Sequence, residues 1–395
     1  MTFTYLENEQ SAKIKVIGIG GAGGNAINNM VDSNLLGVEF IAANTDAQAL
    51  DISKASTKIQ IGAKLTEGLG AGANPDIGRE AALENADVIK KSLEGSHMVF
   101  LTAGFGGGTG TGATPVIAEI CKELGALTVA VISKPFSFEG KKRFQQAEEG
   151  IEGLKDVADT VITIPNDRLR GIAPKNARMI EMFKKADEIL HHSVKGITDL
   201  IMVPGLVNLD FADVRTTMSK AGMALMGIGI ATGENRATEA AERAISHPLL
   251  EDFSISGAKG VLMNITCTSE MTLDEMTEAS DRIYEEVGDE AEIIWGQAID
   301  ENLGEEMRVT VIATGIDSKK DYRSRQKQDD KIKRGVVRDI TSEDLKNASA
   351  FEEPTFIRQK EAVGESGGAS YKGFKGIVLD NDDLDVPTFL RRKAD

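Results

Sequence analysis

Glycine is concentrated in three short segments of this chain. The sequence has 41 glycines among 395 residues, which is about 10% where roughly 7% is usual. Sixteen of them fall in segments 18–24, 62–78 and 104–112, each after an apolar run typical of a β-strand. Flexible linkers would scatter glycine among serines. Clusters that follow strands are instead typical of loops in which the backbone approaches a ligand closely.

Apolar, strand-like runs alternate with helical patterns in the first half of the chain. The strands are expected near 13–19, 38–43, 57–61, 97–103, 127–133 and 159–164. The helices are expected from Gly21 onward and near 76–93, 112–124 and 142–157. Because these strands are apolar along nearly their whole length, they indicate a parallel sheet covered by helices on both faces. The fold class is therefore α/β.

A long helix near 178–202 separates this region from a second one. Its apolar face carries Ile180, Phe183, Leu190, Val194, Ile197 and Ile201. A helix starting at Phe211 follows, then strands near 224–231, 260–268, 291–299 and 307–315, separated by helices near 237–246 and 272–287. This mixture predicts a smaller α+β domain.

The chain changes character after residue 316. Residues 317–380 carry 14 basic and 12 acidic side chains and few apolar ones, a composition typical of disorder. Residues 382–393 regain apolar side chains, which is typical of a short docking motif. The expected organisation has five parts: a parallel-sheet α/β domain at 1–177, a central helix at 178–203, an α+β domain at 204–316, a linker at 317–380 and a tail at 381–395.

Charge and composition exclude several kinds of protein. The net charge of −17 argues against a protein that binds nucleic acid by neutralising phosphates. No apolar run approaches the roughly 20 residues of a membrane-spanning helix, so no direct membrane insertion is expected. Cys121 and Cys267 lie far apart without metal-ligand spacing, so we expect no metal site built from protein side chains alone. Together with an N-terminus that lacks the pattern of a secretory signal, this composition favours the cytoplasm.

The first and second glycine clusters both have the pattern of phosphate-binding loops. Segment 18–23 fits GxGxxG between a strand and a helix, where missing Cβ atoms and free N–H groups can hold a phosphate. That motif alone also fits a dinucleotide-dependent oxidoreductase. Segment 104–112, GFGGGTGTG, also follows a strand and opens a helix. Two such loops at the ends of parallel strands suggest a polyphosphate held from both sides.

A polyphosphate bound here would be held mainly by backbone groups. The chain has no GxxxxGK[ST] motif and therefore no P-loop lysine. Thr109 and Thr111 offer hydroxyls to phosphate oxygens or to Mg²⁺, and backbone N–H groups and helix ends would supply the remaining contacts. The third cluster, which includes Gly68, Gly70 and Gly72, could close over the terminal phosphate.

Read together, these motifs resemble the FtsZ family of bacterial cell-division GTPases, in the tubulin superfamily. The motifs are GIGGAGGN and GGGTGTG, together with NTDAQAL (44–50), GLGAGANP (68–75), KPFSFEGKKR (134–143) and NLDFADVR (208–215). The resemblance covers residues 12–316 in order and also the tail sequence DLDVPTFLRRK. It implies a GTPase that polymerises head-to-tail into filaments of the division ring, with GTP as substrate and Mg²⁺ as cofactor.

The resemblance also implies roles for individual residues. The expected phosphate contacts are Gly21, Ala22, Gly23, Gly24, Asn25, Gly108, Thr109 and Gly110. Gly70, Ala71 and Gly72 would sense the γ-phosphate, and Glu139 and Arg143 would hold the ribose. Asn166 and Asp187 would read guanine, on which Phe183 would stack. Asn208, Asp210 and Asp213 would supply catalytic groups to the nucleotide of the neighbouring subunit.

Two of these assignments have simpler structural alternatives. Asp187 lies on the apolar face of a helix, where a carboxylate is costly unless paired, so an ion pair with a nearby Lys or Arg would also explain it. Asp210 and Asp213 have the spacing of a helix N-cap and its third residue, a purely stabilising arrangement. A cap uses one oxygen and leaves others free, so capping and catalysis are compatible.

The family resemblance also suggests partners and a location. Membrane-anchoring and regulatory division proteins would bind the tail at 382–393, and the filament would assemble at mid-cell on the inner face of the membrane. Two other functions remain open. An oxidoreductase would need a ribose-binding acid about 20 residues after the first glycines, where Ala42, Ala43 and Asn44 stand. A non-catalytic assembly regulator would need a broken acidic loop, and NLDFADV is intact.

Overall fold

The computed structural model describes residues 12–171, 176–203, 210–219, 222–250, 255–288 and 291–316. Asn208, the linker at 317–380 and the tail at 381–395 therefore lie outside the described residues. In the described ranges, every helix is too short or too polar to cross a membrane.

The described strands form one sheet of ten, in the order β3-β2-β1-β4-β5-β6-β7-β10-β8-β9. Their bounds are β1 Ile14–Ile19, β2 Val38–Asn44, β3 Thr57–Gln60, β4 Met98–Gly104, β5 Leu127–Lys134, β6 Thr160–Pro165, β7 Gly222–Ala231, β8 Gly260–Cys267, β9 Glu292–Ile299 and β10 Met307–Thr314. All neighbouring pairs from β3 to β7 are parallel, which confirms the parallel sheet predicted from the apolar runs.

The helices connect these strands at nearly the predicted places. The α-helices are α1 Gly20–Asp32, α2 Ala47–Asp51, α3 Ala63–Thr66, α4 Pro75–Glu84, α5 Ala86–Leu93, α6 Thr109–Glu123, α7 Lys141–Lys155, α8 Asn166–Leu169, α9 Met179–Met202, α10 Phe211–Ser219, α11 Arg236–Ile245 and α12 Leu273–Val287. Short 3-10 helices are η1 Ser137–Glu139, η2 Pro248–Leu250, η3 Ile255–Gly257 and η4 Glu301–Leu303.

Apolar side chains cover both faces of the parallel part of the sheet. On one face, α1 and α9 pack their buried residues, such as Ile27 and Val194, against Val16 and Phe100 of the strands. On the other face, α4 to α7 bury a second cluster around strand residues such as Leu101. Strands covered on both faces have few polar positions, which explains their continuous apolar sequence.

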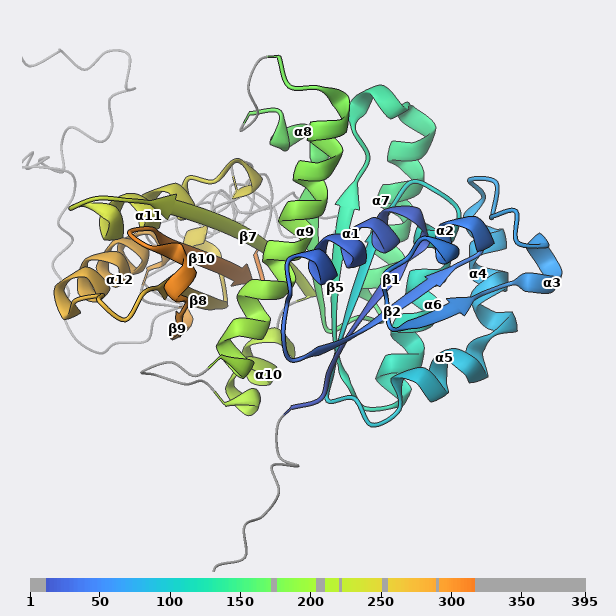
Figure 1. Ribbon diagram of the computed structural model, residues 1–395, viewed down its shortest axis with the longest axis horizontal. Helices are drawn as coiled ribbons and strands as arrows, with labels where there is room; N and C mark the ends of the chain where they lie inside the picture. Colours follow the sequence, from blue (N-terminus) through green and yellow to red (C-terminus); the bar gives the residue numbers. More distant parts are fainter. Residues whose placement is uncertain are drawn as a thin grey trace, which may run out of the picture. The chain divides into compact units, whose positions relative to one another are not determined.

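The second region continues the sheet instead of forming one of its own. β6 and β7 pair in parallel through Thr160 and Gly222, while β10 runs antiparallel to both β7 and β8. α9 packs against β5 and β6 and also against β8 and β9, and Figure 1 shows it running between the two groups of strands. The predicted strands and helices of this region are present, and α11 and α12 bury a third apolar cluster against β7, β8 and β10.

Two helices differ from the expected pattern. The single helix expected at 76–93 is two helices, α4 and α5, separated at Asn85, whose side-chain oxygen accepts a hydrogen bond of 2.8 Å from the Gly62 N–H. The apolar face of α9 is buried at Leu190 and Val194, whereas Ile180 is 63% exposed. The first turns of α9 therefore extend past the core, and their apolar residues are available for other contacts.

Candidate functional site

A cavity of about 420 Å³ lies at the carboxyl ends of four neighbouring parallel strands. It is lined by Gly21, Ala22, Asn25, Gly104, Phe105, Gly107, Gly108, Thr109, Gly110, Ser133, Lys134, Pro135, Glu139, Arg143, Asn166, Phe183, Ala186 and Asp187. These residues follow β1, β4, β5 and β6 or lie on the first turns of α9. Ligands of open α/β sheets bind at this edge, close to where the strand order reverses, here between β1 and β4.

The structure brings most of the predicted nucleotide-binding residues to this cavity. Of the sixteen, eleven line it: Gly21, Ala22, Asn25, Gly108, Thr109, Gly110, Glu139, Arg143, Asn166, Phe183 and Asp187. Five do not: Gly23, Gly24, Gly70, Ala71 and Gly72. The five have different surroundings: Gly23 packs against β4, Gly24 lines a smaller cavity, and Gly70, Ala71 and Gly72 belong to the third glycine cluster.

The first glycine loop places the N-terminus of α1 at the cavity. α1 starts at Gly20 directly after β1 and has no side-chain cap, so its first N–H groups need other partners. Gly21 is exposed, and a Cβ added to it would meet nothing within 4 Å. Gly23 differs, because its Cβ would lie 2.3 Å from the Thr102 carbonyl oxygen. Gly23 therefore lets α1 pack closely on β4, while Gly21 leaves room for a ligand.

The second glycine loop brings the N-terminus of α6 to the same cavity. α6 starts at Thr109 without a side-chain cap, and the Thr111 hydroxyl accepts a hydrogen bond of 2.9 Å from the Gly106 N–H. A Cβ at Gly110 would lie 2.5 Å from the Gly104 oxygen, whereas one at Gly107 would meet nothing within 4 Å. Two helix N-termini thus converge on one cavity, which is a favourable site for an anion.

The third glycine cluster packs against the second. A Cβ at Gly108 would lie 2.7 Å from the Ala71 Cβ and 2.9 Å from the Asn74 nitrogen. Ala71 itself is buried, and its carbonyl accepts a hydrogen bond of 3.0 Å from the Asn74 N–H. The segment at 70–72 therefore contacts the second glycine loop at Gly108 and does not line the cavity in this structure.

Polar side chains also line this cavity, among them Asn166 and Asp187. Asn166 is 5% exposed, and its Oδ1 atom has no hydrogen-bond partner among the residues that the structure describes. Partial burial raises the pKa of Asp187 from 3.8 to about 6. Within the described ranges no ion pair or hydrogen bond engages this carboxyl, so the alternative explanation by a neighbouring Lys or Arg finds no support there.

An aromatic side chain and an ion pair also line the cavity. Phe183 is 40% exposed, and its ring meets the Phe136 ring edge-on at a centroid distance of 5.3 Å. Arg143 Nη1 lies 2.6 Å from Glu139 Oε2. Glu139 Oε1 also accepts a hydrogen bond of 2.9 Å from the Phe136 N–H. These contacts fix Glu139 at the end of η1 and leave donor groups of Arg143 available.

The site prediction missed a third contributing loop. Ser133, Lys134 and Pro135 line the cavity but were not among the predicted site residues; the same holds for Gly104, Phe105 and Gly107 of the second glycine loop and for Ala186 of α9. Lys134 is engaged elsewhere, because its Nζ atom lies 2.7 Å from Glu148 Oε1. Ser133 and Lys134 end β5, so the rule that ligands bind at the carboxyl ends of parallel strands could have identified them.

Two acids of the acidic loop are described, and neither lines the cavity. Asp210 and Asp213 are both exposed at the start of α10. The Asp213 N–H donates a hydrogen bond of 2.8 Å to Asp210 Oδ1, which confirms the predicted N-cap. Asn208 lies outside the described residues. The carboxylates that do line the cavity are Glu139, which is paired, and Asp187.

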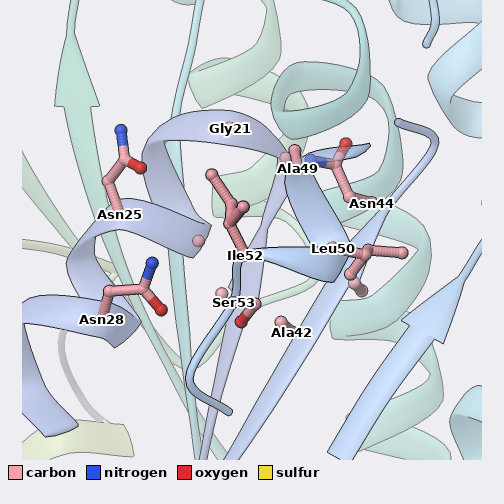
Figure 2. Close-up of a pocket in the computed structure, with 13 residues that line it drawn as sticks. Gly21, Asn25, Asn28, Ala42, Asn44, Ala49, Leu50, Ile52 and Ser53 are labelled. Carbon is pink, nitrogen blue, oxygen red and sulfur yellow. The ribbon is translucent and has the colours of Figure 1, made fainter. Parts of the chain in front are cut away.

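A second, smaller cavity of about 90 Å³ lies beside α1. Gly24, one of the predicted phosphate contacts, lines this smaller cavity, and Gly21 and Asn25 line both cavities. In Figure 2 the Asn25 and Asn28 side chains extend from α1, and Ile52 lies among the lining residues. Asn28 Oδ1 accepts a hydrogen bond of 2.7 Å from the Lys54 N–H. Asn28 thus holds the segment after α2 against α1.

No group of three or more His, Cys, Asp or Glu side chains suited to a metal ion occurs in the described part of the chain. Any cation at the larger cavity would therefore depend on ligands other than such a cluster. Among the side-chain oxygens there, the Thr109 hydroxyl and the Asn25 amide, next to the two glycine loops, are hard donors of the kind that suits Mg²⁺ together with phosphate oxygens and water.

Comparison with known proteins identifies the family. Residues 13–174 match the model of the tubulin/FtsZ family GTPase domain, and residues 222–317 match that of the FtsZ family C-terminal domain. Among solved structures, an empty FtsZ dimer from M. jannaschii is 48% identical, with a TM-score of 0.75, over 78% of this chain and 89% of that one.

More distant structures share the fold. CetZ2 from Haloferax volcanii, in a GTPγS-bound protofilament, is 19% identical with a TM-score of 0.67, over 82% of this chain and 99% of that one. CetZ1 from the same organism, a GDP-bound monomer, is 21% identical with a TM-score of 0.68, over 77% and 94%. Both matched domains and the 48% identity lead to one conclusion: the chain belongs to the tubulin/FtsZ family of GTPases, in its FtsZ branch.

Proposed function

We propose that this GTPase binds GTP in the 420 Å³ cavity and hydrolyses it where two subunits meet in a head-to-tail filament of the division ring. One observation carries the proposal: two helix N-termini without a side-chain cap line one cavity together with Asp187 and with an Asn166 oxygen that has no hydrogen-bond partner among the described residues. This combination of groups fits a guanine nucleotide.

The phosphates would lie against Gly21 to Asn25 and Gly108 to Gly110. Backbone N–H groups would supply most of the contacts, at about 1.5–3 kcal/mol for each hydrogen bond to a charged group. Mg²⁺ would neutralise part of the phosphate charge, with the Thr109 hydroxyl among its candidate ligands. Gly70, Ala71 and Gly72 would respond to the γ-phosphate indirectly, since this segment packs on Gly108.

Asn166 and Asp187 would read the base. Guanine presents N1–H and N2–H donors on one edge, and a carboxylate accepts from both, whereas adenine lacks this pair. Phe183 would stack on the base, and Arg143, oriented by Glu139, would contact the ribose side. The raised pKa of Asp187 fits this role, because a desolvated carboxylate gains more from a matching pair of donors.

The groups that orient the attacking water would come from another subunit. In the described part of the cavity, Glu139 is paired with Arg143 and Asp187 would face the base, so neither is free to act at the γ-phosphate. Asp210 and Asp213 are exposed on α10, outside the cavity, and are available to a neighbouring molecule. Together with Asn208, they would complete the site when subunits stack.

Such stacking is a heterologous contact, and a heterologous contact that does not close produces a filament. The FtsZ match is described as a dimer and the CetZ2 match as a protofilament, which supports assembly of this chain from copies of itself. Hydrolysis would weaken the contact, because the γ-phosphate would no longer lie between the subunits. Assembly would then depend on nucleotide state.

The remaining proposals concern the whole chain in the cell. The domain limits at 177, 203 and 316 stay predictions. The filament would be cytoplasmic and assemble at mid-cell on the inner face of the membrane, where the tail at 382–393 would bind anchoring and regulatory proteins. Deletion of 382–395 should abolish partner binding and leave GTP-driven assembly largely intact. Loss of assembly would show instead that the tail belongs to the folded part.

Sedimentation with different nucleotides tests the proposed function. The full chain with Mg²⁺ should form pelletable polymer with GTP but not with GDP or NADH. Polymer with NADH, or none with GTP, would contradict the proposal. An oxidoreductase would bind NADH without polymerising, and a non-catalytic assembly regulator would pellet with GTP without releasing phosphate.

A further inference from the structure

Thr45 lies behind the cavity and contacts one of its lining residues. Thr45 follows β2 in the sequence and precedes α2. Its side chain is fully buried, and it does not line the cavity. Thr45 Oγ1 lies 2.7 Å from Thr109 Oγ1, a hydrogen bond in which either hydroxyl can donate. Thr109 is half-buried and does line the cavity. The Thr45 hydroxyl can therefore affect a ligand through Thr109, without touching the ligand.

The chemistry of two hydroxyls gives this contact a direction. Each hydroxyl has one proton to donate and lone pairs that accept. When Thr109 donates to a phosphate oxygen, its lone pairs remain free, and Thr45 can donate to it. A hydroxyl that receives a hydrogen bond is polarised and becomes a better donor. An anion in the cavity thus favours the orientation in which Thr45 supports Thr109.

The same residue is tied to the loop that packs on the second glycine cluster. The Thr66 hydroxyl lies 3.3 Å from the Thr45 carbonyl oxygen, and the Ala47 N–H donates a hydrogen bond of 3.0 Å to the Gly68 oxygen. An isolated antiparallel bridge joins Asp46 to Leu69, whose side chain is 83% exposed. Hydrogen bonds from the side chain and from the backbone carbonyl of Thr45 therefore link Thr109 on one side and the segment that carries Leu69 on the other.

We propose that Thr45 is a positioning residue, whose hydroxyl orients the Thr109 hydroxyl toward the nucleotide phosphates and whose backbone carbonyl contacts the segment at 66–69. This inference rests on the proposed binding of GTP in the same cavity. It assigns a function in nucleotide binding to a buried residue that does not touch the ligand. It also gives the exposed Leu69 segment a physical connection to the phosphate site.

A set of substitutions in the full chain tests the proposal with GTP and Mg²⁺ as the probe. Thr45→Val keeps the shape and removes the hydroxyl, and it should raise the Kd for GTP about tenfold, which corresponds to about 1.4 kcal/mol. Thr45→Ser keeps the hydroxyl and should stay within about twofold of wild type. Thr314→Val is the matched control, because it removes an equally buried hydroxyl, which donates to the Gly260 oxygen in the second region.

A double-mutant cycle separates positioning from a general effect on the fold. In a Thr109→Val background, Thr45→Val should change the Kd for GTP by less than about twofold, because its target is gone. An equal tenfold loss of GTP affinity in both backgrounds would overturn the inference, and so would an unchanged affinity in Thr45→Val alone. In either case, GTP binding by the wild type would leave the proposed function standing. If Thr45→Val fails to fold, Thr45→Ala compared with Thr45→Ser gives the same test. A wild type that binds no GTP would instead contradict the proposed function.

Discussion

The backbone N–H of Asp213 donates a hydrogen bond of 2.8 Å to Oδ1 of Asp210. Asp210 thereby caps α10, and the end of the helix fixes where its carboxylate lies. Both side chains are exposed, and neither reaches the cavity of its own subunit. The cap explains how an acidic loop on the surface can present a defined carboxylate to a second molecule.

Substitution of Asp210 can separate capping from catalysis. Asparagine caps a helix about as well as aspartate, so Asp210→Asn should fold with wild-type stability and bind GTP normally. It lacks the negative charge that orients water, so its turnover in the polymer should fall roughly 100-fold. Phosphate release at a fixed polymer mass measures this. Asp210→Ala is the control that also loses the cap, at about 1 kcal/mol of unfolding free energy. Near-normal turnover of Asp210→Asn would refute the catalytic role.

Asp187 should determine which base is bound. Asp187→Asn replaces a pair of acceptors by one acceptor and one donor, which no longer matches the N1–H and N2–H donors of guanine. The affinity for GTP should fall about 30-fold, from the loss of about 2 kcal/mol of charge-assisted hydrogen bonding. Xanthine has a carbonyl in place of the guanine amino group, so the variant should gain relative affinity for XTP. Competition between GTP and XTP measures the change, and an unchanged preference would count against the assignment.

The raised pKa of Asp187 predicts a pH dependence of binding. Burial moves the pKa of this carboxyl from 3.8 to about 6, so the folded protein without nucleotide holds the proton up to higher pH than the unfolded chain. Its contribution to stability therefore falls as the pH rises from about 4 to about 6. Guanine binding requires the ionised form and should strengthen about tenfold between pH 5 and pH 8.

The Asp187→Asn variant is the control for this pH dependence. It retains every other titrating group, including the phosphates of the nucleotide, and should lack the step near pH 6. Equilibrium titration of GTP at several pH values gives both curves. Identical pH dependences in the two proteins would show that another group is responsible.

Glycines at the cavity should fall into two classes. Gly107→Ala places a methyl group in open space at the cavity, so stability should change by less than about 0.5 kcal/mol while GTP affinity falls about tenfold or more. Gly110→Ala forces a Cβ to 2.5 Å from the Gly104 oxygen and should destabilise the fold by about 1–3 kcal/mol. Gly153→Ala, on the exposed face of α7, is a control with an equally open Cβ position. Thermal unfolding and GTP titration separate the classes, and unchanged GTP binding by Gly107→Ala would argue against backbone approach there.

Local sequence patterns were sufficient for most of the fold and part of the site. Apolar runs predicted the parallel strands, and the rule for strand ends predicted that the first two glycine loops meet. The sequence could not show that β7 would join β6, because pairing through Thr160 and Gly222 depends on tertiary packing. The sequence could not show the break between α4 and α5 at Asn85 for the same reason, since the Asn85 side chain accepts a hydrogen bond from the Gly62 N–H, which is distant in the sequence.

Glycine clustering alone did not separate the glycines that face the cavity from those that pack elements together. Gly21 and Gly23 lie two positions apart, yet one leaves open space and the other touches β4. That difference depends on which strand lies behind the helix. The residues proposed to read guanine were assigned by family resemblance. The structure adds that the Asn166 oxygen has no hydrogen-bond partner among the described residues and that a partly buried Asp187 lines the same cavity.

The most direct test of the account is the rate of phosphate release per molecule as the concentration of the full chain is raised with saturating GTP and Mg²⁺. If two subunits share one hydrolytic site, the rate per molecule should be close to zero below a threshold concentration and rise steeply above it, in step with the appearance of polymer. A rate per molecule that is constant from dilute monomer to polymer would contradict the account.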